Sequence, residues 1–416
     1  MTQASGHVHL PFTDAPGSVH FGCLASFFDR PLPGHLRPGI LQSRGTELKL
    51  STKTRAIPVA VALAGSLALA ACGASNESGN GSGSSNASSK TEQLSGTVNG
   101  SGSSAQQAAM QGWTAGFNKA QPNVTVNYDP AGSGAGRTAF IQKAVDFAGS
   151  DAYLSDDELT QAKAACGGND VFELPVYISP IAVVYNLKGV PNLQLSPDTI
   201  GKIFSGSITT WNDPAIKADN PGATLPSTAI TPVHRSDKSG TTKNFTDYLS
   251  EAAPGSWTGG SVDTWPTQGG EAGAQTSGLV QAVKAGDGAI GYADESQAGS
   301  LGVAKIKVGS DYVKPSAEGA AAVVEGSKIH AGRGQYDFAY DITRTPTDSK
   351  QYPLTLVSYH IGCVKYADAG KAGLVQGFEK YVISEEGQKA AAQQAGSAPL
   401  SDALRQQSQK AVDAIS

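Results

Sequence analysis

The chain has 416 residues, which is too long for one ordinary hydrophobic core and predicts two domains. Its 50 Gly and 22 Pro, with only 16% charged and 7% aromatic residues, indicate a loop-rich α/β protein. The formal net charge of −5 at pH 7 argues against nucleic acid as a partner, because domains that bind nucleic acid carry an excess of Lys and Arg.

The first 90 residues predict export of the chain. Lys53-Thr54-Arg55 precedes an apolar run from Ile57 to Ala71, which has the order of a secretory signal and is too short to span a membrane comfortably. We interpret residues 48–71 as a signal peptide and residues 1–47 as a non-native or mis-annotated extension, because translation has a plausible start near Leu48. Residues 73–90 consist mainly of Gly, Ser and Asn, the composition of a flexible tether.

The apolar run ends in Leu69-Ala70-Ala71-Cys72, which resembles the lipobox of bacterial lipoproteins. The resemblance implies that Cys72 is the lipid-modified first residue of the mature chain and anchors it to the outer face of the cell membrane, in a Gram-positive bacterium. Cleavage elsewhere, with Cys72 as an ordinary thiol, is the alternative. Residues 1–71 hold six Lys/Arg and three Asp/Glu, so the mature chain keeps 25 basic and 33 acidic residues, a net charge of −8.

Two of the four cysteines, Cys166 and Cys363, lie in the segment that we expect to fold in an exported, disulfide-permissive compartment. We favour a disulfide bridge between them. Two separate buried thiols are the alternative.

Three turns of small residues join predicted strands to predicted helices. The first joins a strand over 93–104 to a helix over 105–117, and the second joins a strand over 124–128 to a helix over 137–144. The third follows the extended run 229–234 and opens a helical pattern at Asn244, with Ser239 or Thr241 as the expected N-cap. Such helix starts suit anions, because free N–H groups point outward at the positive end of the helix dipole.

Charged residues accompany these turns. Arg235 offers a guanidinium fork for two oxygens of a tetrahedral anion, and Asp237 can hold that fork in place. Asp151 ends a short predicted strand over 145–151, so we expect its carboxylate at a strand tip; an N-cap of a helix over 154–165 is the alternative. Together these parts suffice to surround an oxyanion. A nucleotide cradle is disfavoured, because no Gly-Lys-Ser/Thr ends either of the first two turns.

Four ordered motifs resemble the phosphate-binding proteins of Pst-type ABC phosphate importers: 128–136 (YDPAGSGAG), 145–151 (VDFAGSD), 234–241 (HRSDKSGT) and 288–292 (GAIGY). The resemblance covers about residues 93–405 and implies the periplasmic-binding-protein fold, two α/β lobes joined by two hinge crossovers that close on one phosphate. It further implies a monomeric, lipid-anchored receptor without a cofactor, which hands inorganic phosphate to the permease subunits of an ABC importer.

Carried over motif by motif, the resemblance also implies the ligand contacts. Phosphate is expected to meet Ser104, the N–H of Ala105, Ser133, Asp151, Arg235, Ser239, Gly240 and Thr241, with Asp237 in support. The chain departs from the family at Ser104-Ala105, where the family often has Thr-Phe, and at Gly134-Ala135, where it tends to have Ser-Gly.

A carboxylate in an anion site has a chemical reason. Hydrogen phosphate still carries a proton at neutral pH, and Asp151 can accept that proton in a hydrogen bond, whereas sulfate has no proton to offer. A buried acceptor facing a sulfate oxygen leaves a hydrogen bond unmade and adds repulsion, which predicts discrimination against sulfate.

Two extended runs, over 172–185 and 352–363, have the character of segments that pass between lobes. They predict a discontinuous lobe 1 over residues 91–177 and 351–416, and a lobe 2 over residues 178–350, with both Cys166 and Cys363 in lobe 1. Residues 288–292 are expected to form a buried strand.

Other functions are less well supported. The seven His residues show no metal-ligand spacing, so we expect no metal site. A secreted phosphatase with Ser133 or Ser239 as nucleophile would need a base within reach, and no Ser-His-Asp order stands out. A receptor for phosphonate, arsenate or sulfate is the other alternative, and Asp151 argues against sulfate and molybdate.

Overall fold

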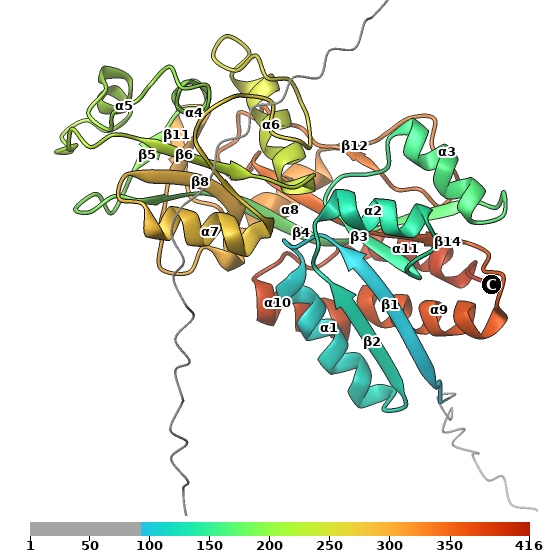
Figure 1. Ribbon diagram of the computed structural model, residues 1–416. Coiled ribbons are helices and arrows are strands. Elements are labelled where there is room, and N and C mark those ends of the chain that lie inside the picture. Colours follow the sequence, from blue (N-terminus) through green and yellow to red (C-terminus); the bar gives the residue numbers. More distant parts are fainter. Residues whose placement is uncertain (1–92) are drawn as a thin grey trace, which may run out of the picture. The chain divides into compact units, whose positions relative to one another are not determined.

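A nine-stranded mixed sheet runs through residues 93–416, the part of the chain that the computed structural model describes (Figure 1). The signal peptide, Cys72 and the tether predicted from the sequence lie outside these residues. Eight strands follow in the order β2 (Val124–Asp129), β1 (Gly96–Gly102), β3 (Phe147–Ser150), β14 (Thr355–Cys363), β4 (Val171–Asn186), β8 (Ala289–Asp294), β6 (Thr231–Arg235) and β7 (Glu271–Gly273). A further strand, β9 (Gly302–Val303), also pairs with β4.

The long strand β4 connects two halves of this sheet. Its first part pairs with β14 as far as Pro180, and its second part pairs with β8 from Ile181 onward. We call β2, β1, β3 and β14 the first half-sheet, and β8, β6 and β7 the second half-sheet. Of the 16 residues of β4, 15 are buried, because the strand is covered on both faces and is apolar almost throughout. The two extended runs predicted from the sequence are therefore strands, while the lobe boundaries at 177/178 and 350/351 stay a prediction.

The three predicted strand–turn–helix units are present. Strand β1 leads to α1 (Gln107–Ala120), β2 leads to α2 (Ser133–Ile141) and β6 leads to α6 (Gly240–Ala252). A fourth unit joins β7 to α7 (Gln275–Ala285). Strands β2, β1 and β3 pair in parallel, as do β7, β6 and β8, so each half-sheet gathers the carboxyl ends of its parallel strands at one edge.

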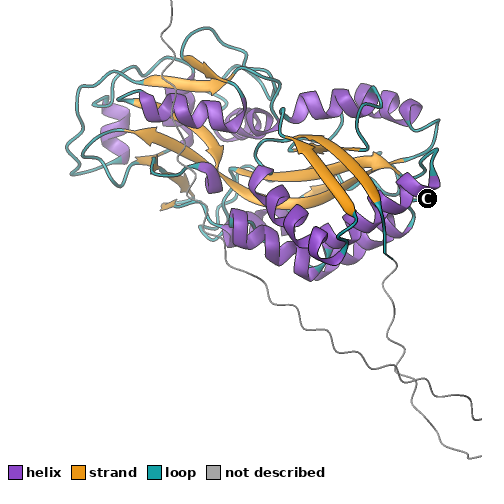
Figure 2. Ribbon diagram, turned by 60° about the horizontal axis from the view of Figure 1, so that its bottom comes forward, coloured by secondary structure: helices purple, strands orange, loops and turns teal. Residues whose placement is uncertain are grey.

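Helices lie on both faces of the strands, as Figure 2 shows. The first half-sheet is accompanied by α3 (Asp156–Ala165), α9 (Ala369–Ile383), α10 (Glu385–Ala395) and α11 (Asp402–Asp413). The remaining elements are β5 (Gln194–Leu195), α4 (Pro197–Phe204), α5 (Pro214–Asp219), η1 (Glu295–Gln297), β10 (Lys305–Val308), β11 (Asp311–Val313), α8 (Ala317–Glu325), β12 (Lys328–Ile329) and β13 (Tyr340–Asp341). Within residues 93–416, no helix combines the length and apolar character needed to cross a membrane.

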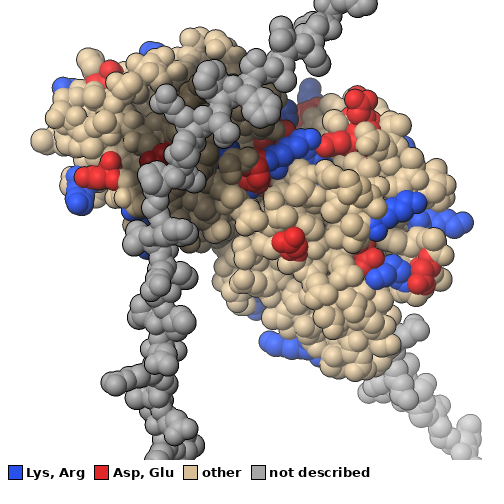
Figure 3. Space-filling view, viewed as in Figure 1, with Lys and Arg blue, Asp and Glu red and all other residues tan. Residues whose placement is uncertain are grey.

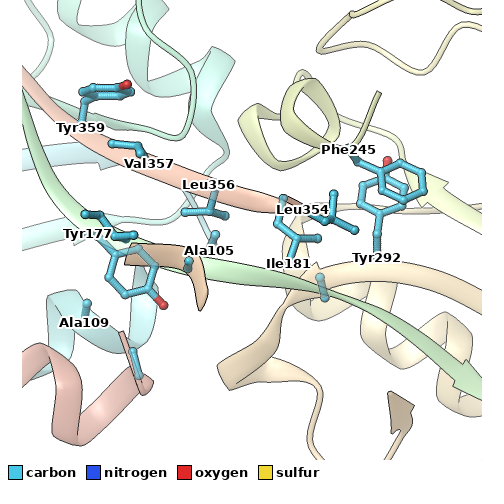
Figure 4. Packing of buried hydrophobic residues seen from close by; sticks show 14 of the residues in the cluster. Ala105, Ala109, Tyr177, Ile181, Phe245, Tyr292, Leu354, Leu356, Val357 and Tyr359 are labelled. Carbon is cyan, nitrogen blue, oxygen red and sulfur yellow. The ribbon is translucent and has the colours of Figure 1, made fainter. Parts of the chain in front are cut away.

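The core follows β4 and β14 from one half-sheet to the other. Figure 4 shows Tyr177 and Ile181 of β4 beside Leu354 and Leu356, at or next to the start of β14. In the second half-sheet the ring of Phe245 stacks on that of Tyr292, with centroids 4.2 Å apart. Every residue of β8 is buried, so the strand predicted over 288–292 is confirmed.

Charges on the face drawn in Figure 3 are mixed in sign. Lys and Arg lie beside Asp and Glu there, and no broad basic area forms on that face.

The predicted disulfide is present. Cys166 follows α3 and Cys363 ends β14, and the bridge between them closes a separation of 197 residues. It ties the connection between α3 and β4 to the far end of β14.

We expect the double variant Cys166→Ser/Cys363→Ser to lose about 2–5 kcal/mol in free energy of unfolding, because the unfolded chain regains the freedom that this long loop closure removes. Urea unfolding of the variant and of the parent protein, each under oxidising and under reducing conditions, measures this difference in free energy of unfolding. An unchanged unfolding midpoint in the variant would contradict a stabilising bridge.

Candidate anion-binding site

Asp151 follows directly after β3 and lies where the two half-sheets meet. The residue is only 3% exposed. Three hydroxyl groups donate hydrogen bonds to its carboxylate: Ser103 Oγ at 2.5 Å and Ser358 Oγ at 2.7 Å to Oδ1, and Thr241 Oγ1 at 3.0 Å to Oδ2. The carboxylate is thus satisfied by neutral donors, one of which comes from α6 beside the second half-sheet.

The starts of α2 and α6 lie against Asp151. The Asp151 N–H donates to Ser133 Oγ at 3.2 Å, and Ser133 is the first residue of α2. Gly240, the first residue of α6, packs so closely that a Cβ there would lie 2.7 Å from Ser133 Oγ and 2.8 Å from Asp151 Cβ. Only glycine fits this contact, which brings two helix N-termini to one carboxylate.

The N-cap of α6 is Ser239, so Thr241 is not the cap. Ser239 Oγ accepts a hydrogen bond from the N–H of Thr242 at 3.2 Å. Asp151 is not a helix cap either, because α3 is capped by Ser155, whose Oγ accepts from the N–H of Glu158. Ser239 and Thr241 are both 1% exposed. Because Ser239 caps the helix, the Thr241 hydroxyl can donate to Asp151.

Arg235 and Asp237 form the predicted pair. Arg235 Nε donates to Asp237 Oδ1 at 2.8 Å and Nη2 donates to Oδ2 at 2.5 Å, so the guanidinium is held at two points. Burial by itself raises the pKa of Asp237, but the hydrogen bonds and positive charge of Arg235 outweigh burial and lower that pKa. Asp237 also accepts the N–H of Gln275 at the start of α7. The Arg235 side chain is 2% exposed and cannot swing away freely.

The turn between β1 and α1 contacts the start of α7. Ser104 Oγ lies 2.9 Å from Thr276 Oγ1 and accepts the N–H of Thr276 at 3.0 Å. Arg235 Nη1 in turn lies 3.5 Å from Thr276 Oγ1. The N–H of Ala105, expected to face the ligand, donates to Ser103 Oγ at 3.1 Å. Ser104 therefore belongs to the Arg235 side of the site, and Ala105 N–H points to the Asp151 side.

The Gly132 turn joins these two sides. A Cβ at Gly132, whose φ is 105°, would lie 2.4 Å from Asp237 Oδ2 and 3.6 Å from Arg235 Nη2. The turn that opens α2 thus touches the Arg235–Asp237 pair while Ser133 touches Asp151. All eight predicted contact residues are buried, and they lie where strands end and helices begin. We call them, with Asp237, the buried group.

Ion pairs surround the group at its outer edge. Arg137 of α2 pairs with Glu158 at 3.1 Å and reaches Asp263, after α6, at 2.8 Å. Lys238 also pairs with Glu158, at 3.1 Å. Burial raises the pKa of Glu158, but Arg137, the Ser155 N–H and Lys238 outweigh burial and lower it. These pairs connect residues that follow different half-sheets.

A cavity of about 190 Å³ adjoins Asp151 on another side, lined in part by Asn244, Arg344 and Val357. Arg344 donates four hydrogen bonds there, to Asp247, to Asn244 Oδ1 and to two backbone carbonyls. Arg235 does not line this cavity.

Three contacting residues escaped the sequence reasoning: Ser103, Thr276 and Ser358. Ser103 stands next to the predicted Ser104, and Thr276 opens a helix after a short strand, so the strand–turn–helix pattern of β7 and α7 is a usable signal. Ser358 is a polar residue in a strand whose nine residues are all buried. A polar residue in such a strand needs a partner, which is the signal for that position.

The buried group therefore offers what a tetrahedral oxyanion needs. It combines a fixed guanidinium, several hydroxyls and three helix starts with a carboxylate that only accepts hydrogen bonds. Within residues 93–416, no three His, Cys, Asp or Glu side chains are grouped in a way that could hold a metal ion.

Known proteins with similar sequences carry names that agree with this chemistry. A model of the PBP superfamily domain matches residues 87–386. Phosphate-binding protein PstS2 of Mycobacterium bovis is 38% identical over 327 residues, which cover 77% of this chain and 87% of that protein. Phosphate-binding protein PstS 3 of Mycobacterium leprae is 37% identical over 325 residues, with the same coverage.

A solved structure has the same architecture. The high-affinity periplasmic phosphate-binding protein PfluDING, bound with phosphate, superposes with a TM-score of 0.62 at 25% identity and covers 75% of this chain and 92% of its own. The two-lobed α/β fold expected from the sequence is thereby confirmed. The chain belongs to the PBP superfamily and, within it, to the family of PstS phosphate-binding proteins.

Proposed function

We propose that this protein binds inorganic phosphate outside the cytoplasm and delivers it to the membrane permease of an ABC-type phosphate importer. The observation that carries the proposal is the buried carboxylate of Asp151 among hydroxyl donors, two helix starts and the fixed Arg235. The relatives named phosphate-binding proteins support the same ligand.

The ligand contacts follow from the chemistry of each group. Arg235 and the starts of α2 and α6 supply positive charge and N–H donors for the phosphate oxygens. Asp151 accepts the proton of hydrogen phosphate. The proposed contact residues are Ser104, the N–H of Ala105, Ser133, Asp151, Arg235, Ser239, Gly240 and Thr241, with Asp237 holding Arg235.

Binding depends on local groups because the protein as a whole repels anions. The mature chain carries a net charge of −8, so long-range attraction does not bring phosphate in. Buried hydrogen bonds and the Arg235 charge act at short range, where the dielectric is low.

Closure of the two lobes is the proposed signal to the permease. The ion pairs of Arg137 with Asp263 and of Lys238 with Glu158 join residues that follow the first half-sheet to residues that follow the second, so they form only when the two lobes close. A ligand held from both sides adds to their stability and shifts the population toward the closed form.

The proposed location is the outer face of the cell membrane of a Gram-positive bacterium, as a monomer anchored by a lipid on Cys72. The lipobox-like sequence before Cys72 and the Gly/Ser-rich tether after it support this proposal.

An enzymatic role has weaker support. The described contacts of Ser133 Oγ and Ser239 Oγ come from backbone N–H groups, which cannot take a proton from a nucleophile. Release of product from a phosphate ester would reveal a phosphatase, whereas the proposed receptor binds free phosphate without turnover. Arsenate and phosphonate are the oxyanions whose chemistry is nearest to that of phosphate.

Asp151→Asn tests the reading of the phosphate proton. The amide offers a donor to sulfate and loses the charged acceptor for phosphate, so we expect selectivity for phosphate over sulfate to fall by about 1.5–3 kcal/mol. Competition calorimetry measures both affinities. Unchanged selectivity would refute the acceptor role.

Arg235→Lys tests the guanidinium fork. Lysine cannot hold two oxygens and two Asp237 contacts at once, so we expect phosphate affinity to fall at least tenfold, by about 1.5–3 kcal/mol. Arg405→Lys is the matched control, because Arg405 pairs with Glu385 and Asp402 at the exposed surface. Equal affinities of the two variants would argue against a contact between Arg235 and the ligand.

Asp263→Asn tests closure. The variant removes the carboxylate that Arg137 meets at 2.8 Å and Lys238 at 3.5 Å, while Arg137 and Lys238 both stay paired with Glu158. We expect phosphate to dissociate about three to ten times faster, for a loss of about 1 kcal/mol, with little change in the association rate. Stopped-flow fluorescence measures both rates, with Asp402→Asn as the surface control. A change in the association rate alone would argue against a role of Asp263 in holding the closed form.

A further inference from the structure

A line of hydrogen bonds between buried side chains ends at Asp151. It runs from Glu379 of α9 through His360 of β14 and Gln106, at the N-cap of α1, to Ser358 of β14. These four residues are 0% exposed. We call them the buried relay.

The distances in the buried relay are those of good hydrogen bonds. His360 Nδ1 lies 2.9 and 3.0 Å from the two Glu379 oxygens, and His360 Nε2 lies 3.1 Å from Gln106 Oε1. Gln106 Nε2 donates to Ser358 Oγ at 2.7 Å, and Ser358 Oγ donates to Asp151 Oδ1 at 2.7 Å.

The fold places these groups in line. Ser358 and His360 are two residues apart in β14, and both side chains reach the Gln106 amide. Gly149 in the neighbouring strand β3 leaves room for the amide, because a Cβ there would lie 2.6 Å from Gln106 Oε1. Trp113, Phe147 and Phe378 surround the His360 ring, with centroids 5.4, 4.7 and 6.1 Å away. The relay is therefore enclosed by aromatic rings, and its polar atoms depend on one another.

The direction of every bond follows from the carboxylate at its end. Asp151 accepts only, so the Ser358 hydroxyl must point its hydrogen at Asp151 Oδ1. Ser358 Oγ then accepts from the Gln106 amide nitrogen, which turns Gln106 Oε1 toward His360. Because that oxygen only accepts, His360 Nε2 must carry a hydrogen. The Nδ1 side shares a second hydrogen with Glu379.

The opposite direction meets a clash. If His360 Nε2 lacked a hydrogen, the Gln106 amide would have to turn over and present Oε1 to Ser358. Ser358 would then give its hydrogen to Gln106, and its oxygen would face Asp151 Oδ1 at 2.7 Å with no hydrogen between them.

We propose that the buried relay of Glu379, His360, Gln106 and Ser358 fixes the Ser358 hydroxyl as a donor to Asp151 and thereby keeps Asp151 an acceptor that reads the proton of the ligand. These four are positioning residues and do not touch phosphate. The inference rests on the proposed function and adds residues that set its selectivity from inside the first half-sheet.

The relay makes one prediction that needs no substitution and no ligand. Nitrogen-15 NMR of the full-length protein with labelled histidine reports which ring nitrogens carry hydrogen. We expect His360 Nε2 to be protonated and its hydrogen protected from exchange. A His360 ring with a bare Nε2 would overturn the proposed direction.

Substitutions separate direction from packing. Ser358→Ala removes the donor, and Gln106→Glu, of nearly the same size, gives Ser358 an acceptor on each side. In both variants we expect the ratio of phosphate to sulfate affinity to fall about tenfold, the effect of losing a hydrogen bond to a charged group. Gln106→Met fills the same space and leaves Ser358 free to donate only to Asp151, so it should lower the melting temperature without changing this ratio.

Each outcome decides the proposal. If the ratio of phosphate to sulfate affinity falls as far in Gln106→Met as in Ser358→Ala, the effect comes from packing of the core and not from hydrogen-bond direction. An unchanged ratio in Gln106→Glu would mean that the relay does not fix the direction of the Ser358 hydroxyl. If Gln106→Glu does not fold, Ser358→Ala and the NMR measurement still test the proposal. Wild-type protein that does not bind phosphate would instead refute the proposed function, while the NMR result would continue to test the relay.

Discussion

The constraint on which this structure depends is the buried carboxylate of Asp151, which we propose lies in a site for anions. Asp151 follows the end of strand β3. Its carboxylate accepts hydrogen bonds from the hydroxyl groups of Ser103, Ser358 and Thr241. Neutral hydroxyls stabilise the charge without cancelling it. We propose that a ligand that brings its own hydrogen completes the arrangement, and that an equally charged ligand without one does not.

The fold delivers these groups because β4 belongs to both half-sheets. Parallel strands on either side of it end near the same place, and the helix starts that follow carry Ser133 and Gly240 to Asp151, while the Gly132 turn meets the Arg235–Asp237 pair. Close approach needs small residues, so glycines stand where α2 and α6 meet. The buried relay then supports Asp151 from behind, which links ligand selectivity to the aromatic core around His360.

The sequence contained the local features of the site and lacked the tertiary ones. Strand–turn–helix patterns predicted three of the four helix starts, and the Arg235–Asp237 pair follows from a separation of two residues. Ser358 and Thr276 lie 207 and 172 residues from Asp151 and Ser104, their partners. Such contacts depend on strand order and register, which spacing along the chain does not specify. The cysteine pair could be predicted because only two cysteines remained in the folding segment.

The most direct measurement is a calorimetric titration of the chain from Gly73 to Ser416 with phosphate, repeated in excess sulfate. The account predicts tight binding of one phosphate per chain that survives the sulfate, because only phosphate offers a hydrogen to Asp151. Binding that sulfate abolishes, or no binding of phosphate, would contradict it.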